Sequence, residues 1–232
     1  MRGRSLLVAV ILVSTWFTGA GDAAPKADKL RIKPAPLKVG SVRIESSTDT
    51  LGGRDSHKVK RTTVLAVDRT GVVTKAKVTY LEIDGKDVAL AGKSYVIATG
   101  DGELEVTPAD GTDPGDEALV RSNNKSFGKL DSTVAMVKDR EFVVGTAVVV
   151  PAPETLPPGT EIKLTLRTFD AESATFDLAI VMKTDKMKMS GNGWLVVDRK
   201  TGHERSTSIN VEIDTGRGRT DKAMLASQVT TE

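Results

Sequence analysis

Two stretches of this chain, far apart in the sequence, are nearly alike, and both have the pattern of a long β-hairpin. VLAVDRTG occupies residues 64–71 and WLVVDRKTG occupies residues 194–202. Each begins as an alternating apolar run, passes an aspartate and a glycine, and continues into a second alternating run. Period-two alternation puts apolar side chains on one face of a strand, and Asp and Gly are common turn residues. The chain is therefore constrained to long antiparallel hairpins.

The likeness between the two stretches is explained by turn chemistry. An aspartate at the first turn position accepts hydrogen bonds from backbone N–H groups, and a glycine at the last position adopts positive φ without strain. We therefore predict hairpins over residues 64–83 and 194–213, with turns at Asp68–Gly71 and Asp198–Gly202. The second turn is longer by one residue, Lys200. We interpret the repeat as scaffold and not as a duplicated functional site.

The rest of the chain predicts a mainly β fold with eight to ten strands. Alternating runs cover residues 161–169 and 175–184, a strand is expected at 142–150, and a last strand around 219–229. An early run from Gly40 alternates too, with Val42 and Ile44 on one face and Ser41, Arg43 and Glu45 on the other. Such hairpins form a curved antiparallel sheet, as a sandwich or a half-open barrel.

A short helical insert is expected at about residues 114–139. Asp113 and Pro114 are typical of a helix N-cap and a first helical residue. Asn123, Asn124 and Gly128 interrupt the pattern and predict one broken helix or two short ones. Apolar residues recur at helical spacing at Phe127, Leu130, Val134 and Val137.

Three segments are predicted along the chain. Residues 1–23 have the pattern of a secretory signal peptide: two arginines, a 12-residue apolar run at 6–17, then small residues. Cleavage after Ala23 is favoured over cleavage after Ala20, and a retained N-terminal anchor is the further alternative. Residues 24–38 carry three prolines and several lysines and predict an extended, poorly paired segment. Residues 39–232 form a single β-rich domain.

Composition argues against several classes of site and partner. The chain has no cysteine, which rules out disulfides and thiolate metal sites. His57 and His203 lack ligand partners at zinc spacing, and His203 is interpreted as a solvated loop residue. The acidic loop Asp110–Glu117 does not match the calcium-loop spacing, although calcium binding there stays open. We expect no cofactor, and the near-neutral charge and 4% aromatic content argue against nucleic-acid binding.

No catalytic constellation stands out, and we predict that the protein is not an enzyme. S-x-x-K at residues 122–125 and K-T-G at 200–202 resemble motifs of penicillin-binding enzymes, but this K-T-G falls in a predicted turn. An enzyme of unrecognised type would have to use carboxylates such as Asp101, Glu103 and Glu105. These more simply form the polar face of a strand.

The segments LKVGSVRIE, EFVVGTAVVVP and GNGWLVVDRKTG resemble those of an uncharacterised group of bacterial cell-envelope proteins. In general outline the chain is similar to periplasmic lipoprotein carriers of the LolA type. That resemblance implies a curved antiparallel sheet covered by helices, with an apolar cavity that holds acyl chains. The resemblance spans most of residues 37–229.

These observations lead to one functional hypothesis and its alternatives. We expect an exported protein, periplasmic or extracellular, that binds an apolar small molecule or lipid on its curved sheet and keeps no stable membrane span after signal cleavage. The alternative is an envelope protein that binds another protein through a sheet edge. The residues expected to face an apolar ligand come from the strand at 175–184 and from the insert: Phe176, Leu178, Ile180, Met182, Phe127 and Leu130.

Overall fold

The computed structural model describes residues 28–51, 54–100, 103–109, 111–112, 114–153, 156–184, 187–214 and 220–232. The predicted signal peptide lies outside them. Eleven strands form one antiparallel sheet: β2 (Val42–Leu51), β3 (Arg54–Val67), β4 (Val73–Ile83), β5 (Ser94–Thr99), β6 (Leu104–Ala109), β8 (Ala147–Val150), β9 (Glu161–Phe169), β10 (Ser173–Lys183), β11 (Lys188–Asp198), β12 (Glu204–Asp214) and β13 (Thr220–Thr231). Their order is β6-β5-β4-β3-β2-β13-β12-β11-β10-β9-β8. The last strand, β13, pairs with β2 and thereby joins the two halves of the chain.

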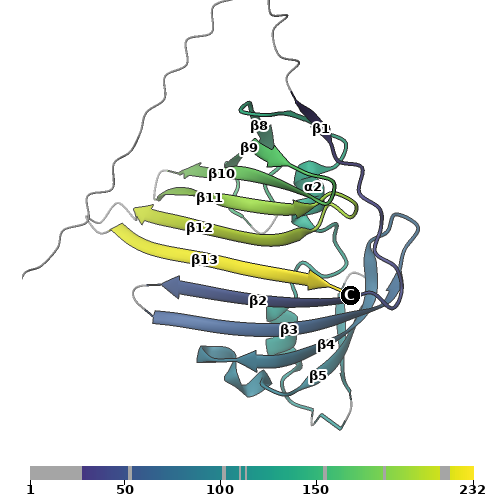
Figure 1. The fold of residues 1–232 in the computed structure, drawn as a ribbon. Helices are drawn as coiled ribbons and strands as arrows, with labels where there is room; N and C mark the ends of the chain where they lie inside the picture. Colours follow the sequence, from purple (N-terminus) through teal and green to yellow (C-terminus); the bar gives the residue numbers. More distant parts are fainter. Residues whose placement is uncertain are drawn as a thin grey trace, which may run out of the picture.

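The sheet is open and the helices cover one of its faces, which we call the inner face (Figure 1). They are α1 (Glu117–Asn123), α2 (Ser132–Val137) and a 3-10 helix, η1 (Gly85–Leu90). Two further strands, β1 (Lys29–Arg31) and β7 (Glu141–Val143), pair with each other as a second, small sheet. The predicted mainly β fold with a helical insert is confirmed.

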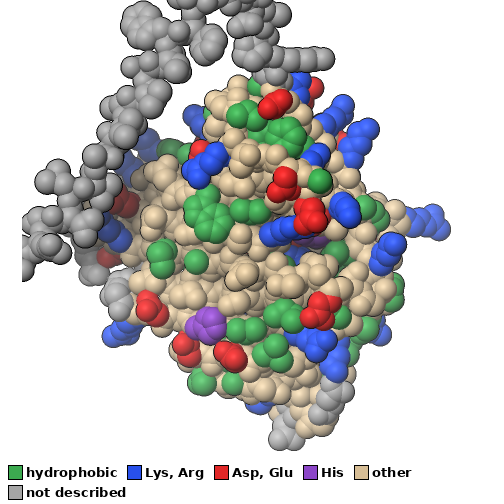
Figure 2. Space-filling view, in the orientation of Figure 1, with side chains coloured by type: hydrophobic (Ala, Val, Ile, Leu, Met, Phe, Trp, Pro, Cys, Tyr) green, Lys and Arg blue, Asp and Glu red, His purple; other side chains and the backbone are tan. Residues whose placement is uncertain are grey.

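The opposite face, which we call the outer face, is free of helices and is the face seen in Figure 2. Charged side chains gather toward its periphery, while its middle is mostly small and uncharged. By strand register the outer side chains at the centre of the sheet include Ser46, Thr48, Ser208 and Ala226. Exposed apolar side chains, among them Trp194 and Met224, lie among these small residues.

Three local predictions need correction. The described residues contain thirteen strands, more than the eight to ten expected. The strand predicted at 142–150 is divided into β7 and β8, because Gly145 has φ +77° and donates its N–H to the carbonyl of Leu166. The first helix begins at Glu117 and not at Pro114, since Gly115 has φ +134°, which no helix accommodates. Asp113 itself lies outside the described residues.

Both repeated stretches form the predicted hairpins. The Asp68 Oδ1 atom accepts hydrogen bonds from the backbone N–H of Thr70 at 2.8 Å and of Val72 at 2.9 Å. The Asp198 Oδ1 atom accepts two from Lys200 and Thr201, both at 2.9 Å. The two closing glycines have φ +85° and +71°. The turn prediction is therefore confirmed in both copies.

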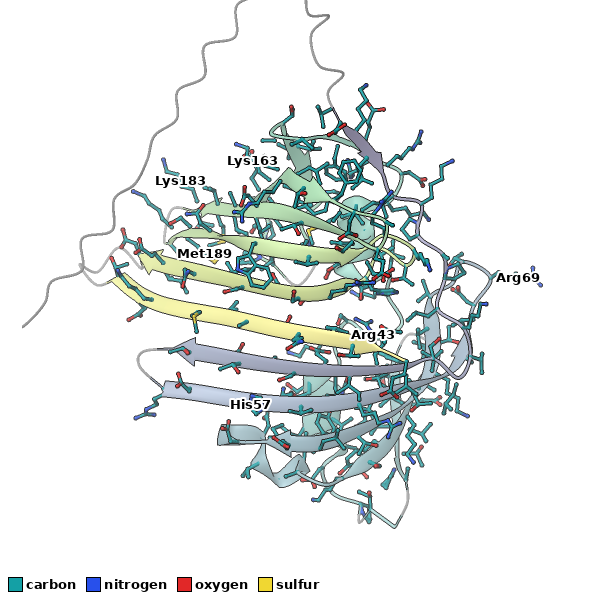
Figure 3. The ribbon with its side chains drawn as sticks, in the orientation of Figure 1. Arg43, His57, Arg69, Lys163, Lys183 and Met189 are labelled. Atoms are coloured by element: carbon teal, nitrogen blue, oxygen red, sulfur yellow. The ribbon has the colours of Figure 1, made fainter. Side chains whose placement is uncertain are left out.

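The arginine that follows each turn aspartate has a different environment in each copy. Arg69 projects from the tip of the β3–β4 turn (Figure 3). Arg199 lies over the ring of Phe169, with its guanidinium carbon 5.3 Å from the ring centroid, and donates to the carbonyl of Asp170. The two arginines share no common contact. This difference supports the interpretation of the repeat as scaffold.

The apolar core has two separate parts, one under each half of the sheet. The first lies under β9, β10 and β11, where Phe142 and Phe176 pack edge to face with centroids 4.9 Å apart. The second lies under β4 and β5, around Tyr80 and Tyr95, and is closed by Val120 of α1. Between the two cores, the inner face of β2 and β3 carries polar side chains. The sheet therefore holds a polar zone between two packed apolar zones.

The N-terminal segment is held much more firmly than expected. Leu30 and Ile32 are buried in the first core. Residues 34–36 then cross both repeated turns. A Cβ atom on Gly71 would lie 2.4 Å from the Cβ of Pro36, and one on Gly202 would lie 2.7 Å from the Cγ of Pro34. The Ala35 N–H also donates to the Lys200 carbonyl at 2.7 Å.

Both repeated turns thus contact one proline segment, Pro34–Pro36. Glycine is needed in each turn for its positive φ and also for this close approach. The prediction of a poorly paired segment is wrong for Lys29–Arg31, which pairs with β7, whereas residues 34–36 form no strand and are held by packing against the turns.

This contact predicts unequal effects of alanine at different glycines. Gly71→Ala should lower the free energy of unfolding by about 2 kcal/mol or more, because backbone strain and the overlap with Pro36 add together. Gly159 is the matched control, since it has φ +83° and a Cβ atom added to it would meet nothing within 4 Å. Gly159→Ala should cost only about 1 kcal/mol. Urea unfolding measures both, and equal losses would show that the proline contact contributes nothing.

Candidate functional site

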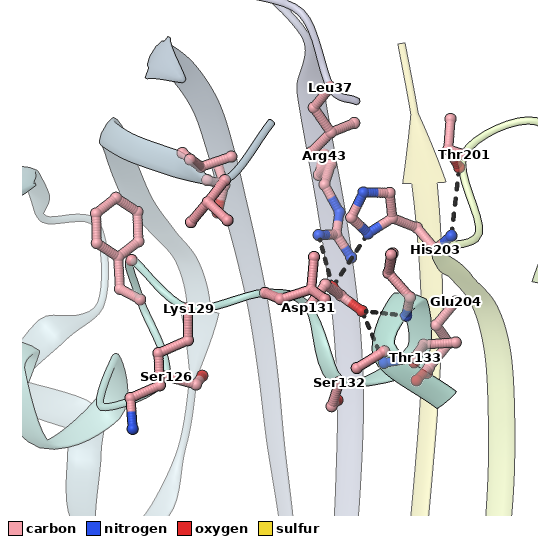
Figure 4. Close-up of a pocket in the computed structure, with 18 of the residues that line it drawn as sticks. Leu37, Arg43, Ser126, Lys129, Asp131, Ser132, Thr133, Thr201, His203 and Glu204 are labelled. Atoms are coloured by element: carbon pink, nitrogen blue, oxygen red, sulfur yellow. Dashed lines mark hydrogen bonds and ion pairs between the residues drawn. The ribbon is translucent and has the colours of Figure 1, made fainter. Parts of the chain in front are cut away.

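A cavity of about 670 Å³ lies between the inner face of the central strands and residues 123–135 of the insert. Residues 34–37 border it on one side, and its mouth is open. Figure 4 shows part of its lining, in which charged side chains from several elements converge. Ligand sites in proteins commonly measure about 300–1,000 Å³. The cavity is therefore of a suitable size for a small molecule.

The floor of the cavity is polar because of the register of the central strands. On β2, Arg43 and Glu45 point to the inner face, while Val42 and Ile44 point to the outer face. We call the following set the polar floor: Arg43 and Glu45 of β2, Lys60 of β3, Glu204 of β12 and Ser227 of β13. The alternation predicted for the run that begins at Gly40 is thus present, and its charged face points to the inner side of the sheet.

Asp131 is the centre of the polar contacts. Its Oδ1 atom accepts hydrogen bonds from the N–H groups of Thr133 at 2.9 Å and Val134 at 3.3 Å, which caps α2. Its Oδ2 atom lies 3.3 Å from Arg43 Nη1 and 3.1 Å from His203 Nδ1. One carboxylate therefore links the insert to β2 and to the residue that precedes β12.

The environment of Asp131 strongly favours its charged form. Burial alone would raise the pKa of this carboxyl. The contacts with His203 and Arg43 and the backbone N–H of Val134 outweigh burial and hold the pKa of Asp131 well below its ordinary value. The carboxylate is thus ionised at every pH at which the protein is expected to work.

The other two acids of the cavity differ from each other. Lys60 Nζ lies 3.2 Å from Glu45 Oε2, and its positive charge lowers the pKa of Glu45 despite burial. Burial raises the pKa of Glu204, and the hydroxyl of Ser227, which donates to its Oε1 atom, only partly offsets that effect. No lysine, arginine or histidine among the described residues lies within ion-pair distance of Glu204.

The structure separates the residues that the sequence grouped as ligand-facing. Phe127 and Leu130 line the cavity, and Leu130 is 44% exposed. Phe176, Leu178, Ile180 and Met182 do face the inner side, as the alternation predicts, but none of them lines the cavity. Phe176 and Leu178 are buried in the first core, Ile180 packs against it and Met182 is almost fully buried. Their contact with a ligand stays a prediction.

Sequence reasoning missed the charged residues of the cavity. His203 is not a solvated loop residue: its side chain is 12% exposed and contacts Asp131. It lies between the turn glycine and the first residue of β12, and its side chain faces the insert. The one available signal was the charged face of the alternating run that contains Arg43 and Glu45.

Those residues considered for metals and catalysis that the structure describes do not gather into a site. Asp110, Asp113 and Asp101 lie outside the described residues, while Asp116 forms an ion pair with Lys93. Glu103 and Glu105 are exposed. Within the described ranges, no three His, Asp or Glu side chains converge as metal ligands.

Comparisons with known proteins leave the chain without a family assignment. A scan against protein-family models finds no match, and a search of curated proteins finds none either. Among the helices that the structure describes, none is long and apolar enough to cross a membrane.

Asp131 predicts a stability effect with a defined dependence on pH. Asp131→Ala should lower the free energy of unfolding by about 2 kcal/mol or more, since it removes the cap of α2 and leaves Arg43 half-buried without its partner. Asp131→Asn keeps the capping oxygen and should cost less.

The sign of the pH effect follows from the lowered pKa of Asp131. Its charge stabilises the folded state fully above the unfolded-state pKa, which is about 3.9, and this stabilisation is lost progressively as pH falls from that value toward the lower folded-state pKa. The difference in the free energy of unfolding between the native protein and Asp131→Asn should therefore be largest at about pH 6 and should decrease toward about pH 3. Denaturant unfolding across this range measures it, and a gap that grows on acidification would contradict the assignment.

Proposed function

We propose that the protein is an exported, non-enzymatic binding protein that holds a ligand with an apolar body and a polar group in the cavity described above. The observation that carries this proposal is the cavity itself. The two apolar cores do not meet beneath the middle of the sheet, and a lined, open space of about 670 Å³ lies between them.

The charged groups in this space support a functional origin. Burying charged groups costs free energy that a packed apolar core would not. Acids with displaced pKa values that gather in a concavity are typical of ligand or active sites. Asp131, Glu45 and Glu204 are such acids in this cavity.

The lining provides for both parts of such a ligand. Phe127, Leu130 and Val73 contribute apolar surface that is still partly exposed, and Val64 and Val134 lie just beneath. The polar floor contributes hydrogen-bonding groups opposite them. A lipid-like molecule has this division, and the resemblance to lipoprotein carriers implies a ligand of the same kind.

A second candidate is an assembly role through a sheet edge. The strand β8 pairs only with β9, so its other edge has no strand partner among the described residues. Val149 on this strand is 56% exposed. An extended segment of another envelope protein would add to this edge by backbone hydrogen bonds.

An environment-sensitive apolar dye tests the cavity proposal. The dye should bind saturably to the folded protein, and Leu130→Glu should weaken binding by about ten-fold, because it puts a charge beside the apolar part of the cavity. Leu81→Glu is the matched control, since Leu81 is 45% exposed but does not line the cavity. Absence of saturable binding, or equal weakening by both changes, would refute the proposal.

Export gives a separate prediction. N-terminal sequencing of the protein recovered outside the cytoplasm should begin at or near Ala24. Val10→Arg, which interrupts the apolar run, should block export and leave Met1 or Arg2 at the N-terminus. A native protein that stays in the cytoplasm with its first residues intact would contradict the predicted signal peptide.

A further inference from the structure

Among the acids that line the cavity, Glu204 is the one with no ion pair in the described residues. Arg43 pairs with Asp131, and Lys60 pairs with Glu45. Two further lysines, Lys129 and Lys138, line the cavity but are exposed at its rim, where water screens them. Glu204 has the Ser227 hydroxyl as its hydrogen-bond partner and, among the described residues, no cation at ion-pair distance.

Glu204 lies at one end of the cavity, away from the apolar side chains of Val73 and Phe127. It is the first residue of β12, and β13 and β2 separate it from the strands that carry the apolar side chains. From Glu204 on β12 to Val73 on β4 there are four interstrand steps of about 4.8 Å each. The cavity is therefore elongated, with Glu204 at one end and Val73 and Phe127 toward the other.

We propose that the ligand is an amphipathic cation, whose positively charged group lies against the Glu204 carboxylate and whose apolar chain lies against Phe127 and Leu130. This inference rests on the proposed binding function and specifies its ligand. A carboxylate accepts up to about four hydrogen bonds, and Ser227 supplies one. A cation near Glu204 replaces the water that the carboxylate loses on burial.

The other two ligand charges fit less well. An anion at this end would meet the Glu204 carboxylate, while Arg43 and Lys60 are already engaged with acids and Lys129 and Lys138 lie exposed at the rim. A neutral alcohol would fill the apolar part equally but leave the charge of Glu204 uncompensated. The charge pattern thus selects a cation over an anion and over a neutral molecule of the same length.

Three probes with the same twelve-carbon chain test this selection: dodecyltrimethylammonium, dodecanol and dodecanoate, each used as a monomer at concentrations that do not unfold the protein. Their binding is measured by displacement of the apolar dye. The cation should bind about ten-fold or more tightly than dodecanol, and dodecanoate should bind most weakly. The fixed charge of the trimethylammonium group ensures that any dependence on pH comes from the protein.

Substitution of Glu204 provides the second arm. Glu204→Gln keeps the size and a hydrogen-bond acceptor for Ser227, and it should remove the preference for the cation without changing dodecanol binding. Glu204→Asp should keep part of the preference. Glu212→Gln is the control on the same strand, because Glu212 is exposed, pairs with Lys222 at 3.2 Å and lies outside the cavity. It should leave all three affinities unchanged.

The outcomes separate the two proposals. Binding of all three probes with equal affinity, tighter binding of dodecanoate, or an unchanged cation preference in Glu204→Gln would overturn the cationic ligand while leaving the cavity as a binding site. Failure of every probe and of the dye to bind would overturn both. Dodecanol binding to Glu204→Gln shows that the variant is folded.

Discussion

The contact between Asp131 and the sheet anchors the second half of the helical insert. One carboxylate caps α2, pairs with Arg43 of β2 and contacts His203 just before β12. Two short helices with a long loop between them would not be held over a sheet by helix propensity alone, because helices of this length are marginal in isolation. This polar contact holds the second half of the insert, while Val120 in the second core and the hydrogen bond from Asn124 to Tyr80 hold the first half. The cavity is the space left beneath the insert.

The repeated turns have a second role in the same architecture. Gly71 and Gly202 let Pro36 and Pro34 approach closely, so the two hairpins hold one segment of chain along the border of the cavity. The chain before β2 is thus fixed at three kinds of contact: the first core, the two glycines and the Ala35 hydrogen bond to Lys200. The likeness of the two stretches comes from turn chemistry, and their common contact comes from how the sheet brings them together.

Burial of charge beneath the middle of the sheet is the feature that most favours a binding function. Closing that space with apolar side chains would have joined the two cores and stabilised the fold. The chain instead places three acids there, of which Asp131 pairs with Arg43 and His203, and Glu45 pairs with Lys60. Glu204 is the exception, and it gives the cavity an asymmetry that a ligand of opposite charge would complement.

The sequence by itself determined the hairpins, their turns, the mainly β class and the interruption of the helical insert, because alternation, turn aspartates and glycines act over a few residues. It also determined the inward stripe of β10, from Phe176 to Met182. Tertiary structure alone decided which face of β2 is the inner one, since Val42 and Arg43 alternate equally well either way. It likewise decided that His203 and Asp131 meet, that Pro34 and Pro36 reach the two glycines, and that β10 closes a core while Phe127 and Leu130 line a cavity. These contacts join residues far apart in the chain, and their geometry depends on the pairing of β13 with β2, which no local pattern encodes.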